Sequence, residues 1–297
     1  MEALQHLEIT RWSGPFSASL QEQAIHTLEH GQVLYCPTLA FALEGEESRF
    51  LSPSCRSGAR KNISYEAARK HLGGASVRDD EVCDLTDLLA RYALVTRGFV
   101  DALIPWYSKA LTQGRTSFRP AEIKLHRPSS YREDDRRLHI DAFPSRPTQG
   151  ARILRVFTNV NLAGQDRLWR VSEPFEDMAR KFLPKVRRQL PAANMMLATL
   201  RITKGVRSEY DHIMIQLHDR IKADCRYQEE VPQTQLAFPP GSTWLMFSDQ
   251  VLHAAMVGQY AFEQTFHLPV SAQRWPDTSP LRTLERLTGH TLASRAL

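Results

Sequence analysis

The sequence contains few cysteines, no long apolar run, and no low-complexity tract or internal repeat. Its four cysteines are scattered without a Cys-X-X-Cys pair, which argues against a thiolate zinc site and against a disulfide scaffold. No apolar stretch approaches the roughly 20 residues of a membrane-spanning helix, and the N-terminus lacks the basic and apolar regions of a signal peptide. We therefore expect a cytoplasmic protein with reduced thiols, soluble or peripheral to a membrane.

The bulk composition is that of an ordinary globular protein. Of 297 residues, 42% are hydrophobic, 24% are charged and 9% are aromatic, which is enough to bury a sizeable core and argues against disorder. The formal charge of +5 and the pI near 9.1 mildly favour an anionic partner, such as nucleic acid, an acidic lipid surface or an anionic metabolite. A slightly basic enzyme without such a partner explains the charge equally well.

The first 118 residues mix helical and strand patterns. Helical spacing of apolar residues predicts helices over 19–30 and about 84–111, the second kinked or ended by Pro105. A strand is expected over 33–43 between them. We interpret residues 1–118 as an α/β cap on a later sheet.

From residue 119 the pattern becomes that of a β protein. Strands are predicted, from alternation or from apolar runs next to turn residues, over 121–126, 152–161, 242–247 and 258–270. This arrangement predicts an α+β fold with a double-stranded β-helix core, a jelly-roll or cupin-like architecture, over 119–270.

We expect a single domain over 1–297, in which a helical insertion of about 164–233 interrupts the jelly roll. Amphipathic helices are predicted within the insertion over 173–189 and 208–222. Residues 271–297 are expected to form a tail with a short polar helix.

His139 and Asp141 stand two residues apart in a stretch of β-like composition. Strand geometry would place both side chains on one face of a sheet. An imidazole and a carboxylate so placed supply two ligands of a 2-His-1-carboxylate facial triad, which binds non-haem Fe(II) and leaves coordination positions open. His253, which ends the segment Phe-Ser-Asp-Gln-Val-Leu-His, is the candidate third ligand.

Each of these residues also has a purely structural interpretation. His139 could be a hydrogen-bonded core histidine, and Asp141 could be a turn carboxylate. His126 is a rival ligand because it is also predicted to lie on a strand. His267 is another, either as a ligand itself or as a residue that contacts a ligand. The spacing alone leaves these alternatives open.

A 2-oxo acid bound to such an iron centre needs a cation or hydrogen-bond donors for its distal carboxylate. Many enzymes of this class place an Arg or Lys about ten residues after the distal His, but residues 260–267 contain neither. A second arrangement places the basic residue on the strand after the ligand pair, although an arginine there could also face solvent. We expect the co-substrate ligands to be Arg155, then Arg152, with Asn159 and Gln264 as hydrogen-bonding helpers.

Longer strings carry more information than the His-X-Asp triplet. They include Arg137-Leu-His-Ile-Asp-Ala-Phe-Pro-Ser-Arg-Pro147 and the stretches 154–161, 210–219, 238–255 and 263–269. Together these strings resemble the 3-deoxy-D-manno-oct-2-ulosonic acid (Kdo) 3-hydroxylase family over most of the chain from about residue 119 to 270.

The resemblance implies a jelly-roll dioxygenase that uses Fe(II), 2-oxoglutarate and O2, with His139, Asp141 and His253 as metal ligands and catalytic centre. It implies hydroxylation of Kdo at C3 in Kdo-lipid A, a lipopolysaccharide precursor of Gram-negative bacteria. The products would be Ko, succinate and CO2. A hydroxylase of another substrate, protein or small molecule, and a non-catalytic jelly-roll binding module are the alternatives.

The implied substrate is an anionic glycolipid, and basic residues suited to carboxylates and phosphates crowd the metal segment and the insertion. Simple pairing with the carboxylates of 133–135 is the alternative for any one arginine. The implied location is the cytoplasmic face of the inner membrane, with peripheral contact through 178–188 and 195–200, unless these segments pack on the jelly roll. Nucleic acid is not expected as a partner, and the oligomeric state is left open. The candidate substrate ligands are Arg127, Arg136, Arg146, Lys204 and Arg207.

Overall fold

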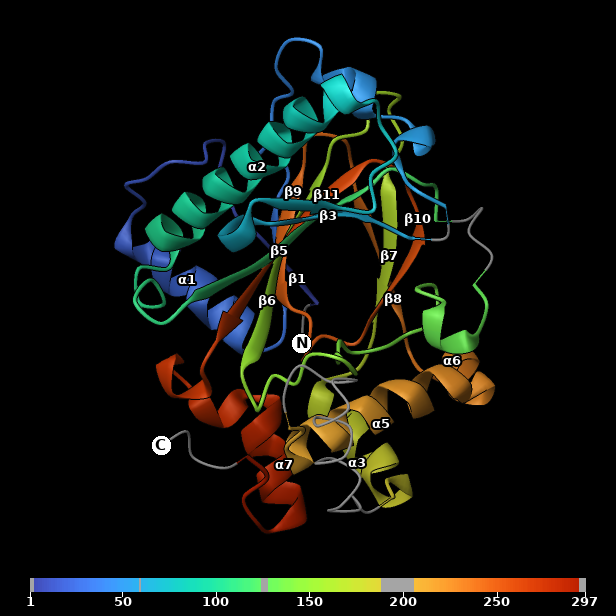
Figure 1. Cartoon of the computed structure of the whole chain (residues 1–297). Helices are drawn as coiled ribbons and strands as arrows, with labels where there is room; N and C mark the ends of the chain where they lie inside the picture. Colours follow the sequence, from blue (N-terminus) through green and yellow to red (C-terminus); the bar gives the residue numbers. More distant parts are fainter. Residues whose placement is uncertain (1–2, 59, 124–127, 188–205, 294–297) are drawn as a thin grey trace.

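The computed structural model describes residues 3–58, 60–123, 128–187 and 206–293 (Figure 1). Two β-sheets face each other: a large one with strand order β1-β2-β9-β6-β11-β5-β3-β4 and a small one with order β10-β7-β8. The large sheet contains β1 (Leu4–His6), β2 (Val33–Cys36), β3 (Ile63–Glu66), β4 (His71–Gly73), β5 (Thr112–Arg119), β6 (Arg152–Asn159), β9 (Thr243–Phe247) and β11 (Ala261–Leu268). The small sheet contains β7 (Arg167–Val171), β8 (Thr234–Phe238) and β10 (His253–Val257). The α-helices are α1 (Ala18–Glu29), α2 (Val82–Leu103), α3 (Phe175–Phe182), α5 (Glu209–Ala223), α6 (Cys225–Glu230) and α7 (Pro280–Thr288).

The space between the sheets is filled at one end by aromatic side chains. Trp169 of the small sheet packs edge-on against Phe157 and Trp244 of the large sheet, and Phe157 and Trp244 stack on each other. A single bridge between His139 and His253 adds a further short segment to the edge of the small sheet. The central strands therefore form the predicted double-stranded β-helix, and the fold class is confirmed.

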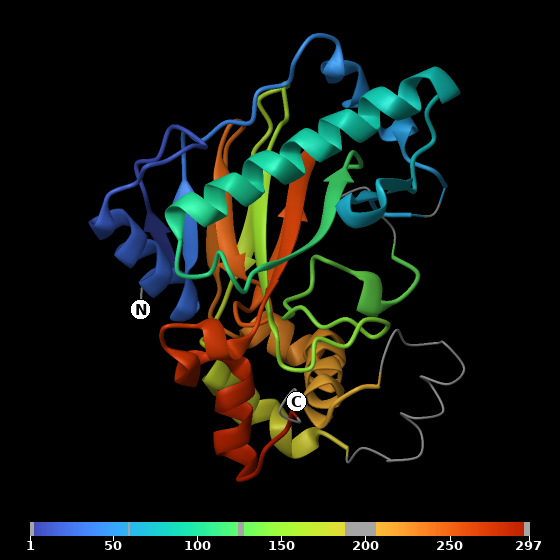
Figure 2. The ribbon, with the colours of Figure 1, turned by 60° about the vertical axis from the view of Figure 1, so that its left-hand side comes forward.

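Helices α1 and α2 cover the outer face of the large sheet (Figure 2). Leu28 and Phe99 of these helices share one buried cluster with Leu154 and Leu245 of the sheet. Because side chains alternate along a strand, the neighbour of Leu154 on β6, Arg155, points the other way, into the space between the sheets. This alternation places one half of the side chains of β6 and β11 on the outer face of the large sheet and the other half in the space between the sheets.

The segment that carries His139 and Asp141 is positioned by the helices at one end of the jelly roll. Leu138 and Ile140 are fully buried in a cluster with side chains of α3, α5 and α7. Their alternate neighbours, His139 and Asp141, therefore point to the opposite side. The backbones of His139 and His253 exchange two hydrogen bonds of 2.9 Å, which fix the two histidines side by side.

Several sequence predictions about the elements are corrected. His139 and Asp141 do not lie in a regular strand, because the bridge to His253 is isolated. The first 118 residues supply β1–β4 and most of β5 to the large sheet itself, so they do not cap a complete sheet from outside. The strand expected over 121–126 is replaced by β5, which ends at Arg119, and residues 124–126 lie outside the described part.

The expected helical insertion also needs a correction, because it contains β7, a central strand of the small sheet. Ser208 caps α5 as predicted, and its hydroxyl accepts a hydrogen bond from the Asp211 N–H. Helix α2 ends before Pro105, whose missing N–H cannot continue the helical ladder. Within the described residues no helix is both long and apolar enough to cross a bilayer.

Candidate metal centre and basic pocket

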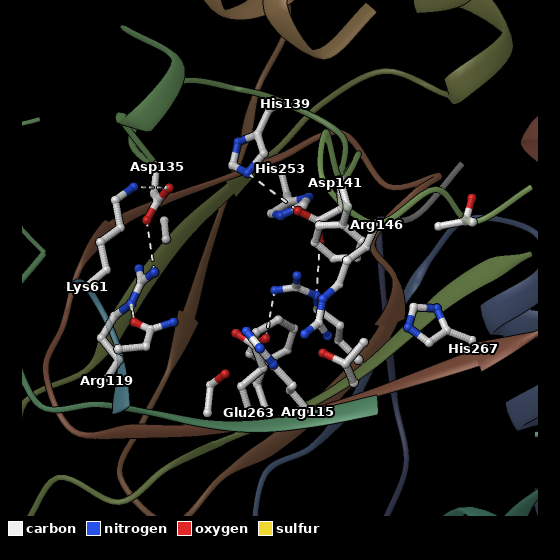
Figure 3. Close-up of a pocket in the computed structure, with 18 of the residues that line it drawn as sticks. Lys61, Arg115, Arg119, Asp135, His139, Asp141, Arg146, His253, Glu263 and His267 are labelled. Atoms are coloured by element: carbon white, nitrogen blue, oxygen red, sulfur yellow. Dashed lines mark hydrogen bonds and ion pairs between the residues drawn. The ribbon is translucent and has the colours of Figure 1, made fainter. Parts of the chain in front are cut away.

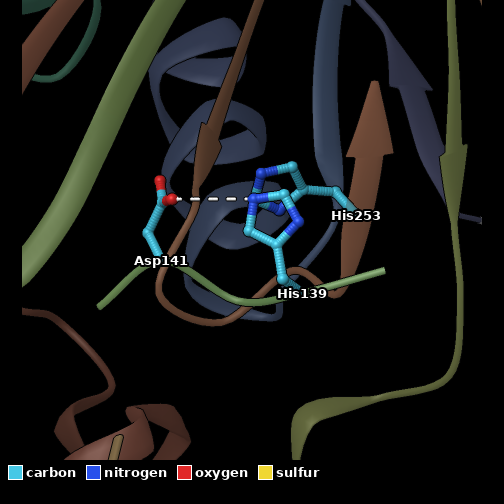
Figure 4. Close-up of side chains that lie close together, drawn as sticks. All are labelled: His139, Asp141 and His253. Atoms are coloured by element: carbon cyan, nitrogen blue, oxygen red, sulfur yellow. Dashed lines mark ion pairs between the residues drawn. The ribbon is translucent and has the colours of Figure 1, made fainter. Parts of the chain in front are cut away.

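His139, Asp141 and His253 come together at the mouth of the space between the sheets (Figure 4). One ligand atom from each lies within 4.8 Å of the others, and His139 Nε2 is 4.0 Å from Asp141 Oδ1. The histidines are 7% and 4% exposed, and the Asp141 side chain is 12% exposed. Two imidazoles and one carboxylate on a rigid frame match the ligand set of a 2-His-1-carboxylate iron centre.

The second nitrogen of each imidazole is held by a backbone carbonyl. Nδ1 of His139 lies 2.8 Å from Arg137 O, and Nδ1 of His253 lies 2.8 Å from Val251 O. A carbonyl oxygen can only accept, so both Nδ1 atoms carry the proton and both Nε2 lone pairs face the shared space. Such outer hydrogen bonds fix the tautomer and ring orientation of metal-binding histidines.

The electrostatics favour the protonation states that bind a divalent metal. Burial lowers the pKa of His139 well below its ordinary value, and neighbouring His253 adds to the shift. Burial also lowers the pKa of His253, although Asp141 opposes this. Burial alone would raise the pKa of the Asp141 carboxyl, but Arg155 and His253 reverse the effect and the pKa is lowered. The site thus offers neutral imidazoles and an ionised carboxylate at neutral pH.

Two aromatic rings pack around the histidine pair. Trp169 is stacked on His253, with ring centroids 5.3 Å apart and an angle of 15° between the planes. His218 of α5 meets His139 edge-on at 5.6 Å, and its Nδ1 lies 3.0 Å from Asp219 Oδ1. These contacts restrict rotation of both imidazoles before any metal binds.

A cavity of about 540 Å³ opens beside the three candidate ligands (Figure 3). It extends between the sheets and reaches the loop at 143–148. Six basic side chains line it but only three carboxylates, so the cavity is positive before a metal is added. The charged residues of its lining are Lys61, Arg115, Arg119, Arg146, Arg155, Arg167, Asp135, Asp141 and Glu263.

Residues 11–291 match the protein family described as 3-deoxy-D-manno-oct-2-ulosonic acid (Kdo) hydroxylase. This chain belongs to that family. The solved structure of the Kdo hydroxylase KdoO, a non-heme Fe(II) alphaketoglutarate dependent dioxygenase, in complex with cobalt(II) is 45% identical, with a TM-score of 0.97 over 100% of this chain and 99% of that chain. The complex of KdoO with alphaketoglutarate and Fe(III) is 44% identical at the same coverage, with a TM-score of 0.96. No curated protein matches the sequence.

Among the expected co-substrate ligands of this Kdo hydroxylase family member, Arg155 alone lines the cavity. Its Nε lies 3.0 Å from Asp141 Oδ2, although the two groups are not aligned for a hydrogen bond. Its Nη1 lies 2.8 Å from Glu263 Oε1. Arg155 is therefore one cation shared by two carboxylates, one of which belongs to the candidate metal-ligand group.

The structure does not place the other three expected co-substrate ligands in the cavity lining. These are Arg152, Asn159 and Gln264. Arg152 is on the outer face of β6, fully buried, and its Nε donates to Asp249 Oδ2 at 2.8 Å. Gln264 shares the outer face of β11 with the apolar core and accepts a 2.6 Å hydrogen bond from the Thr116 hydroxyl. Asn159 holds the end of β6 through hydrogen bonds to backbone carbonyls. Each side chain is committed to internal structure.

The expected substrate ligands divide in the same way. Arg146 lines the cavity. Arg136 does not line it and instead pairs with Asp134 at 2.8 Å, the structural alternative foreseen for it. Arg207 donates to the carbonyl of Pro144 on the cavity loop, so it supports the wall from behind. Arg127 and Lys204 lie outside the described residues, as does the rival ligand His126.

Sequence reasoning missed most of the basic lining. Lys61 and Arg119 reach the cavity from the N-terminal loop and β5, and both pair with Asp135, at 3.0 and 2.9 Å. Arg115 and Arg167 also line the cavity, and the sequence analysis did not predict either of them. The basic composition of residues 52–64 was a usable signal for Lys61, but Arg167 was hidden in the segment assigned to the insertion. His267 lines the cavity yet is not part of the ligand group.

Proposed function

We propose that this protein is an Fe(II)/2-oxoglutarate/O2-dependent hydroxylase that acts on C3 of Kdo in Kdo-lipid A and yields Ko, succinate and CO2. The observation that carries the proposal is the buried His139, Asp141 and His253 group at the wall of a basic cavity. The 45% identity to KdoO over the full chain supports the same assignment.

The chain's own residues would do most of the positioning. Iron, held by the two Nε2 atoms and the Asp141 carboxylate, would supply the activation of O2 and leave coordination positions open to the cavity. Trp169 and Phe157 form an apolar wall beside the ligands, which limits water near the reacting carbon. Because both imidazoles and the carboxylate are held by neighbouring contacts, metal binding requires little reorganisation.

The outer part of the cavity suits an anionic sugar. Arg115 and Arg146 make no side-chain hydrogen bond or ion pair with any other described residue. Burial lowers the pKa of Arg115, and the charge of Arg146 lowers it further. Two uncompensated guanidinium groups so close together favour a carboxylate or phosphate between them. We assign them to the anionic groups of the Kdo-lipid A substrate.

The lipid portion of the substrate would bring the enzyme to the cytoplasmic face of the inner membrane. The apolar side of α3 does not support direct insertion, because Phe175, Met178 and Phe182 are buried against the other helices. The basic side chains Arg180, Lys181 and Lys185 pair with Glu176, Glu173 and Asp224, so a peripheral, electrostatic contact would have to compete with these ion pairs. Residues 195–200 lie outside the described part. Flotation with anionic vesicles at low and high salt tests this contact, which should be lost at high salt.

The decisive experiment incubates the protein with Kdo-lipid A, Fe(II), 2-oxoglutarate and O2, followed by mass spectrometry of the sugar. A gain of one oxygen in the Kdo region, with equimolar succinate, is expected. The His253→Ala variant and lipid A without Kdo serve as controls. Succinate release stimulated by a peptide but not by Kdo-lipid A would replace the proposal with a protein hydroxylase. No stimulated turnover and no co-substrate binding would favour a non-catalytic module.

A further inference from the structure

A fully enclosed ion pair lies on the outer face of the large sheet. Arg152 of β6 is 0% exposed, and Asp249, in the turn after β9, is 1% exposed. The Nε of Arg152 donates to Asp249 Oδ2 at 2.8 Å, and its Nη2 donates to Gln250 Oε1 at 2.6 Å. The guanidinium also lies over the Phe247 ring, 3.9 Å from the ring centroid. These contacts all go to one short stretch, residues 247–250.

Stability alone does not explain this pair. Removing two charges from water costs about as much as their attraction returns, so apolar residues of similar size are often equally stable or more stable. Here the cost is higher, because Nη1 of Arg152 is enclosed and has no hydrogen-bond partner. A buried ion pair can instead select one arrangement of the segments that it joins.

The segment that the pair joins to β6 is the turn of residues 248–252, which connects β9 with β10. Oδ1 of Asp249 accepts a hydrogen bond from the Ile153 N–H at 3.1 Å. The Ser248 N–H donates to Ile153 O at 2.9 Å. Because β6 holds the turn through a side chain and through the backbone, the turn has little freedom to shift along the strand.

Gln250 extends this anchorage to both ends of the chain. While its Oε1 accepts from Arg152, its Nε2 donates to Thr278 O at 3.0 Å and to Glu29 O at 3.3 Å. Thr278 precedes α7, and Glu29 is the last residue of α1. The 248–252 turn is therefore fixed against β6, α1 and the C-terminal segment.

The same turn supports two members of the candidate metal-ligand group (Figure 4). Ser248 O accepts the Asp141 N–H at 2.8 Å. Val251 O accepts from Nδ1 of His253 at 2.8 Å, and His253 directly follows the turn. A displaced turn would move the Asp141 carboxylate relative to the His253 ring. A metal site needs its ligands held to within about 0.5 Å of the productive geometry.

We propose that Arg152 and Asp249 are positioning residues, whose ion pair fixes the 248–252 turn and thereby sets the placement of Asp141 relative to His253. The inference rests on the proposed function, because the metal site belongs to it. Neither side chain lines the cavity, so the pair acts on the metal through the turn and not by contact.

The test removes both charges but keeps an acceptor for the Ile153 N–H. In Arg152→Met/Asp249→Asn, the new amide oxygen can still accept that hydrogen bond. The Co(II) affinity of this double variant should fall by about 10–100-fold, and its cobalt absorption bands, which report the coordination geometry, should shift. The metal-free double variant should be at least as stable as the wild type in urea, because a desolvated ion pair is removed.

Leu28→Ala is the control for stability, because Leu28 is fully buried in the outer core cluster that also contains Leu154. The cavity that it leaves should lower stability, but the Co(II) affinity and the cobalt bands should remain those of the wild type. Gln250→Ala keeps the ion pair and is the milder variant. It should weaken Co(II) binding less than the double variant does.

Wild-type Co(II) affinity and bands in the double variant would overturn the proposal. If the double variant does not fold, the same result in Gln250→Ala would overturn it. An equal loss of Co(II) affinity in Leu28→Ala would also do so, because general destabilisation would then explain the effect. A wild type that does not bind Co(II) would instead overturn the proposed function.

Discussion

The Arg155 guanidinium lies 3.0 Å from the Asp141 carboxylate, measured from Nε to Oδ2, and Glu263 flanks it on the other side. All three side chains are less than one-fifth exposed. Replacing Arg155 by Met would leave two carboxylates buried close to each other. We expect the metal-free variant to lose about 3 kcal/mol of unfolding free energy, measured by urea denaturation. The double variant Arg155→Met/Glu263→Gln should regain part of it; an equally unstable double variant would show that repulsion is not the cause.

Substitutions can distinguish the proposed metal ligands from His267, the other histidine of the cavity. His139→Ala and His253→Ala each remove one of the three proposed ligands, so Co(II) affinity should fall by at least about 100-fold. His267→Ala, which changes the same cavity outside the ligand group, should bind Co(II) as the wild type does. Titration followed by cobalt absorption measures this. Equal losses in all three variants would contradict the assignment.

Asp135 should stabilise the fold over a wide pH range. It joins Lys61 and Arg119, and its carboxyl pKa is lowered below 3.8 because these cations outweigh the effect of burial. A lowered folded pKa contributes stability that is fully present above the unfolded pKa and is lost as pH falls through the folded value. Asp135→Asn should therefore cost about 1–3 kcal/mol, and the difference from wild type should persist from pH 7 down to about pH 4.

Denaturation curves at several pH values check this prediction. The control is Asp80→Asn, because Asp80 and its partner Arg78 are both more than two-thirds exposed and should contribute nothing measurable. A difference between Asp135→Asn and wild type that disappears already near pH 6 would mean that the carboxyl pKa is not lowered.

Gly258 leaves no room for a side chain next to Arg167. Its φ is +127°, and a Cβ at this position would lie 2.8 Å from Arg167 Cγ and 3.0 Å from Arg167 Cα. Gly258→Ala should lower stability by about 2 kcal/mol, because the new Cβ would push against Arg167, without changing Co(II) affinity. Gly164→Ala is the control, since Gly164 also has positive φ but no neighbour in reach. It should lose less stability than Gly258→Ala, because only backbone strain is added. Equal losses of stability in the two variants, measured by urea denaturation, would show that the contact with Arg167 is not the cause.

The outer arginines should act on the substrate alone. Arg115→Gln and Arg146→Gln should each raise the KM for Kdo-lipid A by roughly tenfold with little change in kcat, because they bind substrate and transition state alike. The 2-oxoglutarate affinity should not change. Arg226→Gln, which alters a highly exposed arginine of α6, controls for net charge. Steady-state kinetics of succinate release measure this effect. An unchanged KM in both variants would contradict the prediction.

Alternation along the strands was readable from the sequence, but only in part. It placed Arg155 and Phe157 on one face of β6, where the structure has them. The same rule puts Arg152 on the other face, three residues away, where it pairs with Asp249. On β11 both Glu263 and Gln264 are polar, so the pattern could not say which one faces the cavity. Only the packing of Phe262 and Phe266 on the outer side decides it.

The sequence by itself determined the types of the candidate ligands, two imidazoles and a carboxylate at His139, Asp141 and His253, but it left His126 and His267 as rivals. It also determined the jelly roll through the spacing of its apolar residues. Only the tertiary structure decided which buried arginine of the cavity has a carboxylate partner and which does not. Arg155 meets Glu263 across two neighbouring strands, whereas Arg167 meets no carboxylate in hydrogen-bonding range. The state of a buried charge depends on contacts between segments far apart in the chain, and local patterns do not contain those contacts.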